Sequence, residues 1–155
     1  MINTARKKQK RHSAPTPSPI RATGIGLAAT ALTSAATLLF FSMIIYTTPD
    51  PGSLVLAGGL AALYVSSFVG GLIAALNNRN EPMLCGLLNG VFTFVCLILL
   101  ALVLPTQRVT SLGFWASAGL HLLAVPFSVL GAYAANSLIR SRTQRKRRKR
   151  RTARS

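Results

Sequence analysis

Four long uncharged segments constrain the fold of this chain most strongly. They span residues 22–46, 53–76, 83–104 and 112–139, and none contains Asp, Glu, Lys or Arg. Each exceeds the roughly 20 residues that an α-helix needs to cross about 30 Å of hydrocarbon. Soluble helices keep a polar face for water, so a soluble core does not account for four such helices in succession. We therefore predict an all-α membrane protein, an up-down bundle of four transmembrane helices.

The breaks between these segments carry turn residues. They read TTPDPG at residues 47–52, NNRNEP at residues 77–82 and PTQRVTS at residues 105–111. Proline is well suited to the first turn of a helix, because the N–H that it lacks has no intrahelical partner there. Connections as short as these make consecutive helices antiparallel neighbours. The sequence thus predicts a bundle domain over residues 22–139.

The distribution of Lys and Arg predicts the orientation of the chain. The sequence holds 18 Lys and Arg against two acids, and its two tails, residues 1–21 and 140–155, carry six and ten of these basic residues. With four spans, both tails and Arg79 lie on one side of the membrane and only Arg108 lies on the other. The positive-inside rule then places both termini in the cytoplasm. We expect both basic tails to be disordered, and the first is also rich in proline and serine.

Small residues recur at every fourth position along the second and third segments. Helices in lipid gain no hydrophobic advantage by touching, so they associate by close packing, which small residues permit. The spacing predicts a tightly packed hairpin in which Gly70, Gly71 and Ala74 meet Gly86 and Gly90. We call a row of small residues spaced four apart a ladder. Four residues turn a helix by about 400°, so each residue of a ladder is rotated by about 40° around the helix from the one before. Either the helices cross right-handedly, or the second segment serves two neighbours.

Asn89 lies between the two glycines of GLLNG, and we expect it to make the principal polar contact of the bundle. A buried amide needs a hydrogen-bond partner, and a neighbouring helix offers one. The same small-residue faces could also join two copies of the chain in a homo-oligomer. The helix-packing residues predicted by the pattern are Gly58, Ala62, Ser66, Gly70, Gly71, Ala74, Gly86, Asn89 and Gly90.

The glycine pattern resembles that of a known family. The run GGLIA at residues 70–74, the polar turn after it and the pair Gly86-x-x-x-Gly90 are similar to a family of small four-pass bacterial membrane proteins of unassigned function. In that family one helix ends in Gly-Gly-x-x-Ala, and the helix after a short polar turn carries glycines four residues apart. The resemblance covers the four spans. It implies a bacterial plasma membrane and no known activity.

Few residues within the spans can carry chemistry. His121 lies in the fourth segment, and Pro126 cannot donate a hydrogen bond to the carbonyl of Leu122, so we expect a bend there. The histidine either bonds a neighbouring helix or lines a small wet cavity with hydroxyls such as Ser128. Cys85 and Cys96 are expected to be small buried packing residues. No span contains a carboxylate, and no zinc, phosphate-loop or Ser–His–Asp motif occurs, so we predict no enzymatic activity, no cofactor and no metal.

The C-terminal tail is a dense cluster of positive charge. Lys and Arg just inside a membrane attract anionic lipid headgroups by roughly 1 kcal/mol per residue near the surface. The same charges would bind nucleic acid through its phosphates, although no aromatic residue is present to stack on bases, which argues against sequence-specific recognition. A contact with a protein or ribosome is a further alternative. The predicted anionic-lipid contacts are Arg145, Lys146, Arg147, Arg148, Lys149, Arg150 and Arg151.

These features favour a non-catalytic accessory or scaffold subunit that packs against a membrane-protein partner. A holin-like pore former is the main alternative, because small size, several spans and a basic cytoplasmic tail fit that class. A small solute transporter or channel is the second alternative. It would need a polar path along Ser66, Ser128 and His121.

Overall fold

The computed structural model describes residues 18–78, 80–103 and 114–152 of the chain. These residues form α1 (Pro19–Tyr46), α2 (Pro51–Asn77), α3 (Pro82–Val103), α4 (Phe114–Leu122) and α5 (Ala124–Thr152). Four stretches are long and apolar enough to cross a membrane, namely Pro19–Tyr46, Leu54–Asn77, Pro82–Val103 and Ala118–Ser141. The prediction of an all-α bundle of four membrane-spanning helices is confirmed, and the chain is a multi-pass membrane protein. The predicted span ends at residues 104 and 112 lie outside the described residues, as do Arg79, Arg108 and residues 1–17.

Prolines set the first residue of three helices. Pro19, Pro51 and Pro82 begin α1, α2 and α3. Each lies where a helical N–H would have no partner, so the ring costs no hydrogen bond there and its fixed φ favours the helix. The hydroxyl of Ser18 adds a cap to α1 by accepting a hydrogen bond from the backbone N–H of Arg21 at 3.5 Å. The turn sequences therefore determine where the helices begin.

The fourth span is broken between α4 and α5. The break lies at Leu123, three residues before Pro126. Proline offers no N–H to the carbonyl four residues back, and its ring crowds that carbonyl, so the helix cannot continue straight through this position. The backbone N–H of Phe127 donates to the carbonyl of Leu123 at 3.4 Å and restores the helix on the far side of the break. The predicted bend in this span is confirmed.

The helix α5 runs further than the sequence pattern indicated. A disordered tail was expected from residue 140 onward, whereas the structure continues the helix without interruption to Thr152. The membrane-spanning part of α5 already forms a helix, so residues that follow it extend that helix without the unfavourable step of nucleating a new one. Arg, Lys and Gln are good helix formers, and positive charge near a helix C-terminus interacts favourably with the helix dipole.

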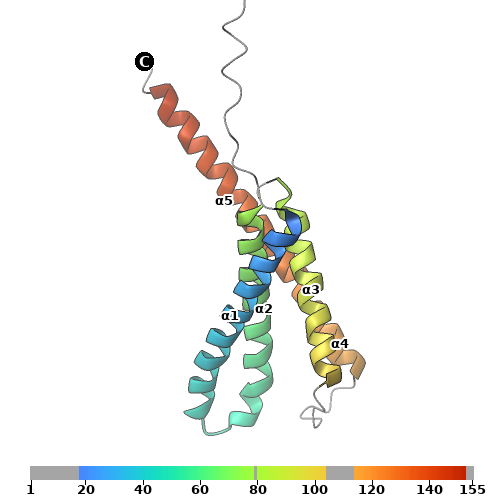
Figure 1. Cartoon of the computed structure of the whole chain (residues 1–155). Coiled ribbons are helices and arrows are strands. Elements are labelled where there is room, and N and C mark those ends of the chain that lie inside the picture. The colour runs from blue at the N-terminus through green and yellow to red at the C-terminus, as the bar shows by residue number, and fades with distance from the viewer. Residues whose placement is uncertain (1–17, 79, 104–113, 153–155) are drawn as a thin grey trace, which may run out of the picture.

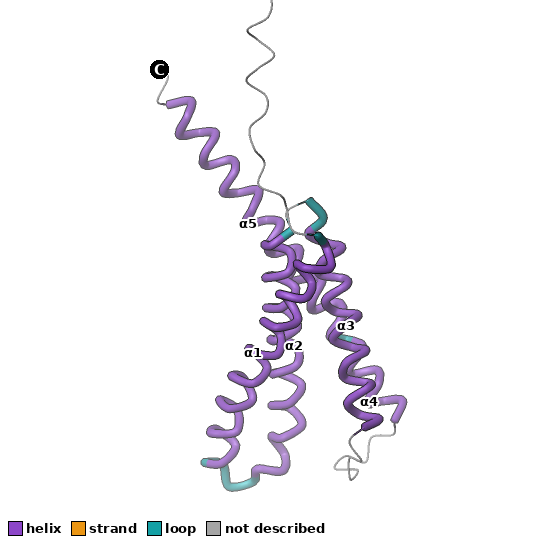
Figure 2. Tube along the Cα trace, viewed as in Figure 1, coloured by secondary structure: helices purple, strands orange, loops and turns teal. Residues whose placement is uncertain are grey.

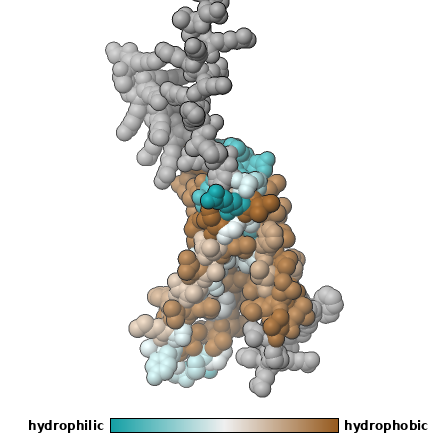
Figure 3. All heavy atoms as spheres, in the orientation of Figure 1, coloured by the Kyte–Doolittle hydropathy of each residue, from teal (hydrophilic) through white to brown (hydrophobic). Residues whose placement is uncertain are grey.

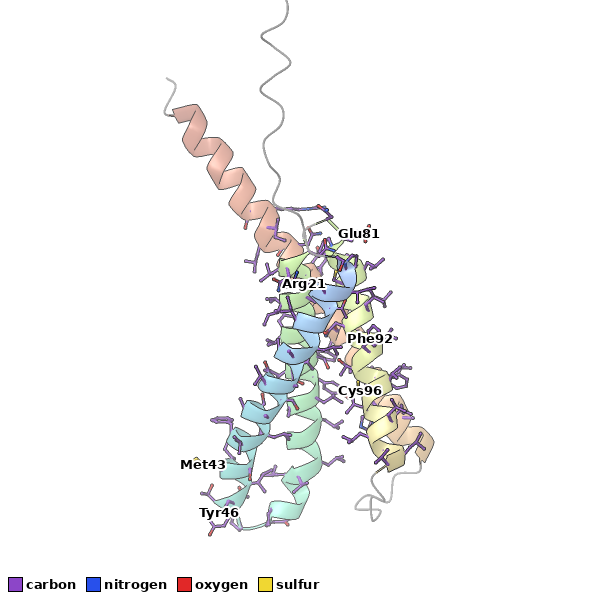
Figure 4. The ribbon with its side chains drawn as sticks, in the orientation of Figure 1. Arg21, Met43, Tyr46, Glu81, Phe92 and Cys96 are labelled. Atoms are coloured by element: carbon purple, nitrogen blue, oxygen red, sulfur yellow. The ribbon has the colours of Figure 1, made fainter. Side chains whose placement is uncertain are left out.

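The bundle is tight at one end and open at the other. Figure 1 and Figure 2 show the helices crossing closely near the end from which α5 leaves, while the α1–α2 pair and the α3–α4 pair diverge toward the opposite end. Arg21 and Glu81 lie at the tight end, and Tyr46 lies at the far end (Figure 4). The buried residues of α1, which are Ala22, Thr23, Gly26 and Thr30, all belong to its first half. The helix–helix contacts are therefore concentrated in the half of the bundle that holds the start of α1.

The core is built from small and polar residues, and the large apolar residues face outward. The largest fully buried side chains are Asn89, Thr23, Cys85, Ser66, Ser67 and Ser128. Large hydrophobic residues such as Leu39, Phe40, Leu99 and Val103 are exposed, and hydrophobic residues cover most of the surface in Figure 3. A water-soluble bundle would bury these residues, whereas lipid is as apolar as leucine and leaves close packing to the small ones. The described helices are thus suited to contact with the lipid bilayer.

The two thiols lie in different surroundings, which corrects one expectation. Cys85 is fully buried, but Cys96 is exposed. Eleven residues turn a helix by about 1,100°, so both thiols project from nearly the same face of α3. Cys96 nevertheless lies in the half of the bundle where the helices diverge, and none of the described helices covers it (Figure 4). The expectation that Cys96 is a buried packing residue is wrong.

The difference between the thiols gives a test of the open half. In detergent micelles, we expect Cys96 to react with N-ethylmaleimide at least about ten times faster than Cys85, because only an accessible thiol reacts. The variants C85S and C96S each leave one thiol, whose labelling is followed by mass spectrometry. Unfolding in SDS should bring the two rates together. Equal rates in the folded protein would show that α3 is packed alike along its length.

Candidate functional site

A buried amide joins three helices at the centre of the tight half. Asn89 of α3 is fully buried, and its Nδ2 donates to Thr30 Oγ1 of α1 at 3.4 Å and to Ser128 Oγ of α5 at 3.2 Å. The two hydroxyls donate onward, Thr30 to the carbonyl of Gly26 at 2.9 Å and Ser128 to the carbonyl of Gly86 at 2.8 Å. We call Thr30, Asn89 and Ser128 the polar junction. In the sequence, Asn89 is 59 positions from Thr30 and 39 positions from Ser128.

Glycines on α1 and α2 make room for the amide. A Cβ added at Gly26 would lie 2.8 Å from Asn89 Oδ1, 2.9 Å from the carbonyl oxygen of Gly70 and 2.7 Å from the Cβ of Ala74. A Cβ added at Gly70 would lie 3.0 Å from Asn89 Nδ2 and would collide with Thr30 Oγ1. Distances below 3.0 Å are too short for real Cβ contacts. The junction therefore needs a bare backbone on both sides of the amide.

Two buried oxygens have no hydrogen-bond donor within the described part of the chain. They are Asn89 Oδ1 and Ser67 Oγ. The first faces the backbone of Gly26, close to where a Cβ would lie. A Cα hydrogen is a weak donor to such an oxygen, and contacts of this kind recur where helices approach closely. The glycine thus removes a steric conflict and also presents a weakly polar group to the amide.

The second helix contacts two neighbours through two separate ladders, whereas the prediction divided one ladder between them. Gly58 faces Phe41 and Ile45 of α1, and Gly70 near the other end of the same ladder again faces α1, at Gly26 and Thr30. A second ladder, which includes Gly71 and Ala75, is displaced by one residue and faces α5. A Cβ added at Gly71 would collide with the backbone oxygen of Ser128, and Ala75 packs with Ala132 and Ala135. The two ladders of α2 thus separate the α1 contact from the α5 contact.

The predicted meeting of glycines between α2 and α3 has the wrong partners. A Cβ added at Gly86 would meet Ala132 of α5, and one added at Gly90 would lie 2.9 Å from the Cα of Val125 of α5. Both glycines therefore face α5. The helix α3 reaches α2 through the preceding positions, since Cys85 packs with Ala74 and Asn89 lies beside Gly70. One residue turns a helix by about 100°, so this small shift in sequence exchanges one neighbouring helix for another.

The remaining predicted packing residues also lie in the interior. Ala62 and Ser66 of α2 are both 1 % exposed, and the hydroxyl of Ser66 donates to the carbonyl of Leu63 on its own helix at 3.0 Å. His121 is half-buried in the last turn of α4, at the break that Pro126 causes. Ser128, predicted together with His121 as a polar candidate, belongs instead to the polar junction on α5. Within the described ranges, no three His, Cys, Asp or Glu side chains come together in a way that could hold a metal ion.

Tyr64 is a contact that the sequence reasoning missed. Its hydroxyl donates to the carbonyl of Leu120 at 3.2 Å, and its ring stacks on Phe127 with 4.7 Å between centroids and 9° between planes. The carbonyl of Leu120 is one of the last four in α4, and these have no intrahelical partner. Tyr64 thus holds α4 and α5 from the two sides of the break. The proline was a signal of this contact, because a broken helix leaves carbonyls that need a donor from elsewhere.

Tyr64 is open to a direct test. We expect the variant Y64F to retain the ring stack but to cost about 0.5–1 kcal/mol in the free energy of unfolding, the usual worth of one interhelical hydrogen bond in a membrane protein. The backbone amides around residues 118–124 should exchange hydrogen faster than in the wild type, which mass spectrometry can measure. A matched control is Y133F, because Tyr133 is exposed on α5. Equal exchange in Y64F and Y133F would contradict a role of this hydroxyl at the break.

Comparison with known proteins places this architecture in a family. A family model described as "Protein of unknown function (DUF3792)" matches residues 19–134, from the first residue of α1 into α5. No curated protein matches the chain, and no solved structure matches it. The matched residues include the polar junction, Tyr64 and both ladders of α2. They stop before the basic run of α5.

Proposed function

Since the chain belongs to the DUF3792 family of integral membrane proteins of unknown function, we propose on that premise that it is a non-catalytic accessory or scaffold subunit. It would pack within the membrane through small-residue helix faces and would hold another membrane protein by its lipid-facing helices. This role requires a rigid bundle with a defined outer surface. It requires no reacting group and no bound cofactor.

The observation that carries the proposal is the use of the polar side chains in the core. Asn89 Nδ2 and the two hydroxyls of the polar junction donate either to a neighbouring helix or, for Thr30, to a carbonyl of its own helix. Interhelical hydrogen bonds of this kind add about 0.6–2 kcal/mol each to helix association in membranes. The three that cross between helices all lie within the same bundle. Such an interior supports a structural role for the membrane domain.

The same geometry argues against the transporter alternative. A solute path was expected along Ser66, Ser128 and His121, yet Ser66 and Ser128 are 1 % and 0 % exposed. The hydroxyl of Ser128 is committed to the carbonyl of Gly86, and Gly71 packs against the same residue. Opening a path there would require α2, α3 and α5 to separate. The holin-like alternative makes a different demand, namely that several copies assemble around a pore.

We further propose a bacterial plasma membrane with both termini in the cytoplasm. The support is the charge distribution, because the tails and Arg79 hold 17 of the 18 Lys and Arg. Arg21 lies at the tight end of the bundle, the end from which α5 leaves (Figure 4). The basic residues nearest the membrane, such as Arg21 and Arg140, would contact anionic headgroups there.

Co-purification from native membranes tests the scaffold proposal. The full chain and a chain lacking residues 141–155 are extracted in mild detergent, and bound proteins are identified by mass spectrometry. A stable membrane-protein partner of the full chain would support an accessory role, and its loss on truncation would assign the contact to the tail. A homo-oligomer alone, unchanged by truncation, would contradict it.

Forced expression separates the scaffold from a holin. A pore former stops growth abruptly and collapses the membrane potential, which a voltage-sensitive dye reports within minutes of induction. We expect no such collapse. A collapse that is lost when the polar junction is disrupted by N89A would overturn the scaffold proposal in favour of the pore former.

A further inference from the structure

The helix α5 carries the basic run out of the bundle without a break. It extends over 29 residues from Ala124 to Thr152. Figure 1 shows it leaving the tight end of the bundle as one continuous helix that points away from the other helices. The last large apolar residue along it is Ile139, and the basic run Arg145–Arg151 follows six residues later. The direction of the run is therefore set by the membrane-spanning part of the same helix.

This continuity carries most of the run past the lipid headgroups. The membrane-spanning stretch ends at Ser141, so at 1.5 Å per residue, residues 145–151 lie about 6–15 Å along the axis from its end. The headgroup region of one leaflet is only about 5–8 Å thick. At the average tilt of about 20° for membrane helices, these heights shrink by less than about a tenth. A flexible tail could fold back onto the headgroups, but the axis of a continuous helix leads away from them.

The composition of this helical arm is unsuited to a flat membrane surface. Residues 142–152 are Arg, Lys, Thr and Gln only, so this arm has no apolar face to bury and only its charge could hold it on a membrane surface. Seven consecutive basic residues at about 100° per residue occupy the whole circumference of a helix. A plane of anionic lipid would meet only one side of such a helix. Phosphates arranged on two facing walls would meet all of it.

A nucleic-acid duplex has that arrangement of phosphates. The major groove of B-form DNA is about 12 Å wide and admits an α-helix between its two phosphate backbones. Binding would also relieve the repulsion between basic residues four apart in the run, which otherwise weakens the helix. The arm contains no aromatic residue, so it has no group that stacks on bases. Its contacts would be to phosphates and would be independent of sequence.

We propose that the segment Arg145–Arg151 of α5 is a nucleic-acid-binding arm that engages duplex phosphates without reading the base sequence. The biological use of the arm rests on the proposed cytoplasmic position of the C-terminus. Membrane attachment would then tether nucleic acid to the membrane at a distance set by the length of the helix. Double-helical RNA carries the same phosphates, but its major groove is deep and narrow, so we expect the RNA duplex to bind more weakly than the DNA duplex.

The test uses the full chain in nanodiscs of phosphatidylcholine, with fluorescent 20-base-pair DNA and RNA duplexes followed by anisotropy. Nanodiscs expose both faces of the membrane, so the result does not depend on orientation and can fail or succeed separately from the proposed function. With about seven phosphate contacts, the affinity for duplex DNA should fall by roughly 10³-fold or more between 50 and 200 mM salt. Replacing all seven basic residues by glutamine, a good helix former, should weaken binding at least about 100-fold at low salt.

Two further variants serve as controls. The first replaces Arg6, Lys7, Lys8, Lys10 and Arg11 by glutamine, and it should retain most of the affinity. The second, T143P, keeps every charge but breaks the helix before the run, because proline removes a helical hydrogen bond and crowds the preceding turn. In discs that contain phosphatidylglycerol, we expect T143P to bind duplex about tenfold more weakly than the wild type, since its freed run can settle on the anionic headgroups.

Each of the following results would overturn the proposal. The seven-glutamine variant, or a chain lacking residues 142–155, binds duplex as well as the wild type. Phosphatidylglycerol reduces duplex binding by the wild type to the level of the seven-glutamine variant, which would assign the run to lipid. T143P and the wild type behave alike in the anionic discs, which would show that helix continuity does not hold the run away from the membrane.

Discussion

The variant G71A should force α2 and α5 apart and lower the free energy of unfolding by about 2–3 kcal/mol, the upper part of the range for overpacking a close-packed interior. The new methyl group would collide with the backbone oxygen of Ser128 and would lie 2.6 Å from its hydroxyl oxygen. A side chain can rotate away from such a contact, but a helical backbone cannot. The displacement would also disturb the hydrogen bond that Ser128 makes to Gly86.

The matched control is G59A on the same helix. Gly59 is exposed, and a Cβ added there meets nothing within 4 Å. Both substitutions gain the same helix propensity, which favours alanine over glycine by up to about 1 kcal/mol. The difference between them therefore isolates the steric conflict. Unfolding by SDS in mixed micelles, followed by circular dichroism, measures both values, and equal stabilities would refute the close approach of α2 and α5.

The variant N89A should cost about 2 kcal/mol, because it removes two interhelical hydrogen bonds and the packing of the largest fully buried side chain. The hydroxyls of Thr30 and Ser128 would keep their bonds to the carbonyls of Gly26 and Gly86. The loss would therefore fall on the links between helices. Folding of each separate helix should be unaffected.

A control and a double-mutant cycle sharpen this prediction. N77A removes an amide whose Nδ2 donates to the carbonyl of Ile73 on its own helix, so it should cost well under half as much. The cycle N89A, S128A and the double variant should give a coupling energy of about 0.5–1 kcal/mol. A coupling of zero would show that the two residues are neighbours without an energetic link.

Much of the architecture follows from local sequence. The absence of charge over four segments predicts four spans, because each residue inside hydrocarbon must be apolar or paired. Proline at the first position of three helices and the break before Pro126 are likewise local, since they arise from one missing N–H. The buried position of Asn89 was also foreseeable, because a single amide between two glycines in an apolar segment has few other places to go.

Other features depend on contacts that local sequence does not contain. The exposure of Cys96 reflects the divergence of the helix pairs in one half of the bundle. Tyr64 has no special signal of its own, since its partner is a carbonyl exposed by a break elsewhere in the chain. The length of α5 depends on whether repulsion between basic residues or extension of the existing helix has the larger effect. A count of basic residues does not show which effect is larger.

The sequence by itself determined that this chain crosses a membrane four times with basic tails, and that its helices meet through small residues. Only the tertiary structure decided which helices meet. Glycine, alanine and serine occupy two adjacent ladders on α2, and two glycines lie four residues apart on α3, so several pairings would satisfy the close-packing rule equally well. The observed pairing brings together the bare backbone of Gly26, the amide of Asn89 and the hydroxyl of Ser128, which requires a particular rotation of each helix. Such rotations are properties of all the helices at once, and no single segment encodes them.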